Sequence, residues 1–105
     1  MTVEVLADRI AAQVSGWGPA RWRSATGDGA ARGDVMHRLI QGLADLCAEA
    51  EGREPRPVPR LDNDYALPDQ LRVMTRDLAT VTDEPVAERA RELLRAAHTA
   101  LFTGL

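Results

Sequence analysis

Four stretches of this chain repeat apolar residues at intervals of three or four, the spacing that places side chains on one face of an α-helix. The stretches cover 3–15, 34–51, 69–81 and 84–102, and the last carries the stripe Val86, Ala90, Leu93, Ala97 and Leu101. Alternation of β-branched residues is nowhere sustained, so no strand is expected. Because each helix must bury its apolar face against the others, the sequence predicts an all-α fold, a small four-helix bundle.

A proline-rich segment separates the second and third predicted helices. Residues 52–68 hold four of the six prolines, and those at 55, 57 and 59 alternate with other residues. Proline fixes its backbone and lacks an N–H group, so this segment favours an extended strap over helix or central strand. Its apolar residues are Val58, Leu61, Tyr65 and Leu67, which predict a strap packed across the bundle as a rigid crossover. A proline-rich ligand for a partner is the alternative.

The connection between the third and fourth predicted helices is much shorter. Only the residues around Val81 separate them, so an antiparallel hairpin is expected there.

At the end of the first predicted helix, Gly16 has the position of a left-handed cap. With 105 residues, the chain has the length of one domain.

Charge and composition narrow the function classes. The net charge of −3 arises from 13 basic and 16 acidic residues that interleave along the chain. No block has the single sign that a phosphate-binding surface needs, so nucleic acid is not expected as a partner and a nucleic-acid-associated regulator is the second alternative. All the basic residues are arginine and 17 residues are alanine, a usage typical of GC-rich bacterial genomes.

The N-terminus and the cysteine content suggest a compartment. Cys47 is the single cysteine, which excludes an internal disulfide and fits a reducing environment. The first ten residues carry Glu4 and Asp8 in place of a basic start and an apolar run, so no signal peptide is expected. No apolar stretch approaches the length of a membrane span. The sequence therefore predicts a cytoplasmic protein with no membrane partner.

Acidic pairs on the predicted helices are the main candidates for metal chemistry. Asp45 and Glu49 share one helix face, as do Glu88 and Glu92, and two such pairs meeting across a bundle could hold Mg²⁺. The alternative is that both acidic pairs lie on solvent-exposed helix faces and form salt bridges with nearby arginines. The sequence favours this alternative, with no catalytic residue, no metal site and no cofactor expected.

The histidines and the cysteine do not form a recognisable metal motif. His37 and Cys47 lie ten residues apart on one predicted helix, which separates them by about 15 Å along the axis. His98 is on another helix and could join only one of them. Cys47 falls on the apolar stripe and is expected to be a small core residue.

Both tryptophans lie in residues 15–24, and the sequence gives them different roles. Trp17 continues the stripe of the first helix and is predicted to close the core. Trp22 lies between Arg21 and Arg23, a composition enriched in protein–protein hot spots. Two interpretations remain open for Trp22: a ring lying over the open end of the bundle with an arginine stacked on it, or an exposed anchor that binds a partner together with Arg21 and Arg23.

The resulting prediction of function is a non-catalytic protein–protein interaction module, such as a small bacterial adaptor, regulator or immunity-type protein. It would act through a helical face and the Trp22 loop on a protein partner or on itself. A metal-dependent bundle enzyme using the four helix carboxylates is the alternative. Val73, Leu94 and Phe102 lie beside the main stripes, and this surplus of apolar surface predicts a homodimer.

Overall fold

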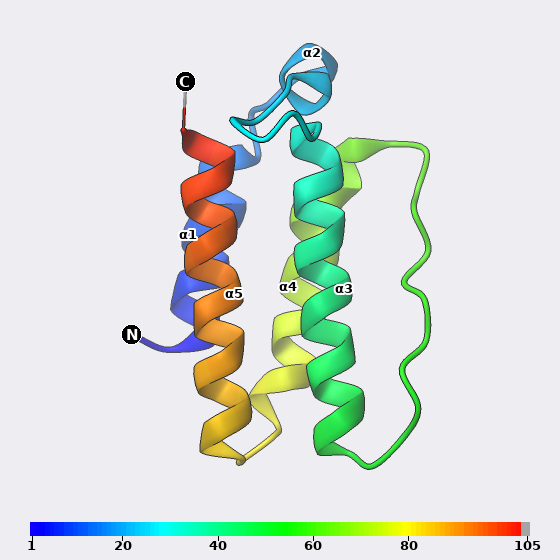
Figure 1. The fold of residues 1–105 in the computed structure, drawn as a ribbon, viewed down its shortest axis with the longest axis vertical. Helices are drawn as coiled ribbons and strands as arrows, with labels where there is room; N and C mark the ends of the chain where they lie inside the picture. The colour runs from blue at the N-terminus through cyan, green and yellow to red at the C-terminus, as the bar shows by residue number, and fades with distance from the viewer. Residues whose placement is uncertain (104–105) are drawn as a thin grey trace.

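The computed structural model describes residues 1–103, which form helices joined by loops (Figure 1). The elements are α1 (Val3–Val14), α2 (Pro19–Arg23), α3 (Arg32–Ala50), the 3₁₀ turn η1 (Asp64–Ala66), α4 (Leu67–Ala79) and α5 (Glu84–Phe102). Over this part of the chain the only strand-like pairing is an isolated bridge between Ala25 and Ala31. The predicted all-α class is therefore confirmed.

Helix boundaries follow the local sequence signals, with some differences. The side chain of Thr2 accepts a hydrogen bond from the amide of Val5, and that of Asp83 accepts one from the amide of Val86, so both helices begin at capping residues. Gly52 follows α3 with φ of 70°, which suits a residue without a side chain. Gly16 is not left-handed, since only Gly29 and Gly52 have positive φ among the described residues, and the expected cap there is wrong.

The long helices are arranged so that neighbours in sequence are not always neighbours in space. α1 packs against α4 and α5, and α3 packs against the same two helices. α4 and α5 run in opposite directions, as in a hairpin, but they lie diagonally across the core and hardly pack against each other. The predicted packing of the two helices as a hairpin is therefore wrong. α3 and α4 are adjacent and run in the same direction (Figure 1).

The parallel pairing of α3 and α4 explains the strap. A chain that leaves the end of α3 must return along the whole helix before α4 can start beside it, and residues 52–63 make this return (Figure 1). Gln41 on α3 binds the strap backbone twice: its Oε1 accepts from the amide of Val58 at 2.7 Å and its Nε2 donates to the carbonyl of Arg56 at 3.0 Å. His37 Nε2 donates to the carbonyl of Val58 at 3.0 Å. The strap is thus attached to α3 at its middle.

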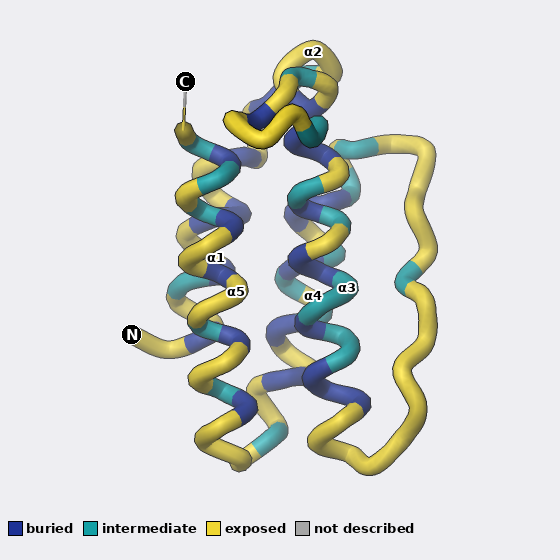
Figure 2. Tube along the Cα trace, in the orientation of Figure 1, coloured by how far each residue is buried: buried dark blue, intermediate teal, exposed yellow. Residues whose placement is uncertain are grey.

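Buried residues line the inner faces of the long helices, whereas most residues of the strap are exposed (Figure 2). One stripe differs from the prediction: on α5, Leu94 is 0% exposed and belongs to the core, whereas Leu93 is 37% exposed. Both leucines satisfy a helical spacing from Ala90, so the sequence pattern could not choose between them. Because Leu94 is buried, it adds no surplus apolar surface, and that part of the homodimer argument is wrong.

Candidate functional site

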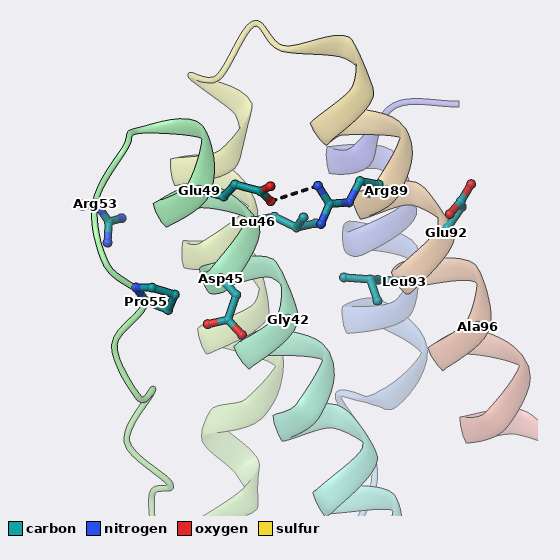
Figure 3. Close-up of a pocket in the computed structure, with 10 residues that line it drawn as sticks. All are labelled: Gly42, Asp45, Leu46, Glu49, Arg53, Pro55, Arg89, Glu92, Leu93 and Ala96. Atoms are coloured by element: carbon teal, nitrogen blue, oxygen red, sulfur yellow. Dashed lines mark hydrogen bonds and ion pairs between the residues drawn. The ribbon is translucent and has the colours of Figure 1, made fainter.

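An open groove of about 840 Å³ lies between α3 and α5 (Figure 3). α3 and α5 pack against each other along this side, and the start of the strap closes one edge. The residues that line it are Gly42, Asp45, Leu46, Glu49, Arg53, Pro55, Arg89, Glu92, Leu93 and Ala96.

The floor of the groove is apolar and made partly of small residues. Gly42 and Leu46 come from α3, and Leu93 and Ala96 come from α5. A Cβ atom added at Gly42 would lie 3.1 Å from Leu93 Cδ1, so the missing side chain gives the Leu93 side chain the space it occupies. Glycine inside a helix lowers the stability of the helix by up to about 1 kcal/mol relative to alanine. In α3, this destabilising residue lines the groove.

Three of the four predicted metal ligands lie in this groove. Glu49 is paired with Arg89, with 2.9 Å between Oε2 and Nη1 (dashed in Figure 3). Asp45 accepts a hydrogen bond from Gln41 Nε2 at 2.9 Å, and it has no ion pair among residues 1–103. Glu92 likewise has no ion-pair partner in the described chain. Two of the three groove carboxylates are therefore without an opposite charge.

Glu88, the fourth predicted ligand, is not part of the groove. Its carboxylate pairs with Arg91 at 2.7 Å and with Arg95 at 3.7 Å. The hydrogen bond from Arg91 holds the pKa of Glu88 below its ordinary value, with the charge of Arg95 acting in the same direction. Over residues 1–103, no three His, Cys, Asp or Glu side chains are close enough together to hold a metal ion.

Trp22, the predicted partner-binding residue, lies elsewhere and points inward. It is 1% exposed and packs edge-on against Trp17, with ring centroids 4.9 Å apart. The exposed-anchor interpretation is therefore wrong. The short helix α2 turns its one large apolar side chain onto the end of the core and leaves Arg21 and Arg23 exposed.

The alternative interpretation of Trp22 holds in part. The ring does cover the end of the core, but the arginine stacks on the other tryptophan: the guanidinium carbon of Arg21 is 5.7 Å from the ring centroid of Trp17. Trp17 itself is buried, as predicted. Its ring also contacts Phe102 edge-on at 5.4 Å, so the predicted surplus at Phe102 is partly covered within the chain.

Cys47 is a buried core residue, as the sequence predicts. Its thiol donates to Glu51 Oε1 at 3.2 Å, and burial, followed by this hydrogen bond, raises the pKa of the thiol above its ordinary value. The histidines are engaged separately. His37 holds the strap, and His98 Nε2 lies 3.0 Å from Gln13 Oε1.

The residues that form the groove floor escaped sequence reasoning. Leu93 was assigned to the core stripe, and Gly42 and Ala96 carry no functional group. The available signal was Gly42 itself, since a glycine in the middle of an otherwise regular helix often marks a close approach or a site.

Comparisons with known proteins give no family or function for this arrangement. No family model, curated protein or solved structure matches the chain. Among the described helices, none has the length and apolar content needed to cross a bilayer.

Proposed function

We propose that this chain is a non-catalytic protein–protein interaction module built on a four-helix bundle with a proline-rich crossover, and that its partner binds in the groove between α3 and α5. The observation that carries the proposal is the apolar floor of this groove, where Leu93 is exposed beside Gly42 and Ala96. A groove between two helices is a common receptor for a third helix that inserts an apolar face.

The charges around the floor favour one kind of partner. Asp45 borders the groove from α3 and Glu92 borders it from α5, both without an ion pair in the described chain. Glu49 is already neutralised by Arg89. A partner helix with a leucine-rich face flanked by lysine or arginine would meet apolar surface in the centre and unpaired carboxylates at both sides. We therefore expect a cationic amphipathic helix.

A pair of synthetic peptides tests this expectation. One is an amphipathic helix with a leucine face flanked by lysines, and the other has glutamate in place of each lysine. Fluorescence anisotropy should show binding of the lysine peptide and much weaker binding of the glutamate peptide. Leu93→Asp should weaken binding of the lysine peptide at least about tenfold, since it places a charge on the apolar floor.

The matched control is Val5→Asp, because Val5 is 46% exposed on α1, outside the groove. This variant should bind the lysine peptide as the parent does. Equal binding of both peptides, or equal loss with both variants, contradicts the proposal. A large rise in melting temperature on adding Mg²⁺ or Mn²⁺ would instead favour the metal-dependent enzyme, because a ligand that binds only the folded state stabilises it.

The same proposal includes a cytoplasmic location and self-association as a homodimer. Cys47 is buried and forms no disulfide, which supports a reducing compartment. Support for a dimer comes from Val73, which is 55% exposed on α4.

A further inference from the structure

We propose that α4 is the self-association surface, and that two copies pair their α4 helices antiparallel about a twofold axis next to Val73. This inference rests on the self-association included in the proposed function. It concerns a different face from the groove between α3 and α5, so the two surfaces can be tested separately.

The outer face of α4 has an apolar centre. Val73 is the most exposed large apolar residue within the long helices, and it borders a hollow of about 330 Å³ together with Leu61, which is also exposed. The remaining apolar wall comes from Ile40, Val58, Ala66 and Met74. A valine side chain from another molecule would find apolar contacts here that the chain does not make for itself.

The charges on the same face are arranged for a second copy. Asp69 precedes Val73 by one turn and Arg76 follows it by about one turn, so all three lie on one stripe of α4. In an antiparallel pair centred between residues 72 and 73, Val73 meets its counterpart while Asp69 of each copy faces Arg76 of the other. The stripe is thus complementary to itself, which is what a twofold interface requires.

The existing contacts of these two charges leave them available. Arg76 has no ion pair within residues 1–103. Asp69 pairs only with Arg72 at 3.6 Å, and 83% of the Asp69 side chain remains exposed. In the same register, the two Asp69 side chains are about 10 Å apart along the helix axes, because each residue adds 1.5 Å. The pairing therefore creates two opposite-charge contacts and brings no acids together.

Sedimentation equilibrium over a concentration series tests the dimer. The parent chain should reach twice the 11.4 kDa mass of one chain at high concentration. Val73→Asp should raise the dissociation constant at least about a hundredfold, because it places two carboxylates at the centre of the interface. Val5→Asp, an equally simple change at another exposed valine, should leave the dimer intact.

Charge exchange tests the register. Asp69→Arg and Arg76→Asp should each weaken the dimer about fivefold or more, since each creates like-charge contacts, and the double variant should restore it. Circular dichroism checks that every variant is folded. A monomeric parent at about 100 μM, a value far above typical specific dissociation constants, overturns the inference, and so does a double variant that stays weak.

The groove assay separates this inference from the proposed function. If Val73→Asp is monomeric and still binds the lysine peptide, both proposals stand. If Leu93→Asp disrupts the dimer and Val73→Asp does not, the dimer forms through the groove and the α4 assignment is wrong.

Discussion

The Nε atom of Arg32 donates a hydrogen bond to the carbonyl oxygen of Leu101, 2.8 Å away, although the two residues are 69 positions apart. The other donors of Arg32 bind Thr103 O at 2.7 Å, Ser24 Oγ at 2.9 Å and Ala25 O at 2.7 Å. Arg32 is only 3% exposed. Its charge lies where the last carbonyls of α5 lack helical partners and carry partial negative charge, so a cation is favourable there.

Arg32→Lys should destabilise the fold by about 2–3 kcal/mol, because a single ammonium group cannot reach four acceptors in these directions. Denaturant unfolding measures the change. Arg38→Lys, an exposed arginine on the same helix, is the control and should change stability by no more than about 0.5 kcal/mol. A loss below about 1 kcal/mol for Arg32→Lys would show that the network contributes little.

Trp17→Ala and Trp22→Ala should each cost roughly 3–5 kcal/mol, since both leave a large cavity in the core. Replacement by phenylalanine should separate them. Trp22 Nε1 is buried without a hydrogen-bond partner in the described structure, so Trp22→Phe removes an unsatisfied donor and should cost less than Trp17→Phe. Both indoles should resist acrylamide quenching, and ready quenching of Trp22 in Trp17→Phe would contradict its buried position.

Gly42→Ala should stabilise α3 by about 0.5–1 kcal/mol, because alanine has the higher helix propensity and the exposed Leu93 side chain can shift outward. The same change should weaken binding of the lysine peptide, since it narrows the groove. Gly33→Ala is the comparison: its Cβ would lie 2.9 Å from Arg60 Nη2 and 3.0 Å from Asp64 Oδ2, a paired set of groups. Thermal unfolding should therefore show the gain at Gly42 alone.

The raised pKa of the Cys47 thiol predicts that the folded state loses stability at alkaline pH. The native pKa of the thiol is raised by burial, so the folded state keeps its proton where the unfolded state loses it. This contribution is fully present below the ordinary thiol pKa of 9.0 and is lost as pH rises from there through the native pKa. Unfolding free energies measured from pH 7 to pH 10 should fall less steeply for Cys47→Ala than for the parent. Parallel curves would contradict the prediction.

Periodicity predicted the four long helices but not the details that depend on distant partners. α3 begins at Arg32 and not at 34, although a cation in the first turn of a helix is unfavourable by itself. The end of α5 compensates, and that contact is invisible in the local sequence. Pro19 starts the short helix α2, because proline is favoured in the first turn of a helix.

The candidate site was only partly predictable for a related reason. Asp45, Glu49 and Glu92 could be chosen as carboxylates on helix faces, and α3 and α5 do bring them to one groove. The sequence could not show what these carboxylates do, because the ion pair between Glu49 and Arg89 and the inward orientation of Trp22 depend on tertiary contacts. Leu93 and Leu94 differ by one position, and only packing decides which is exposed.

The diagonal placement of α4 and α5 has a consequence for how the molecule assembles. The chain before the strap contains α1 and α3, which hardly touch, and the chain after it contains α4 and α5, which hardly touch either. Each half therefore buries the apolar stripes of its long helices mainly on the long helices of the other half. Separate fragments ending and beginning in the strap should be largely unstructured alone and fold on mixing, so the protein is a natural candidate for a split reporter.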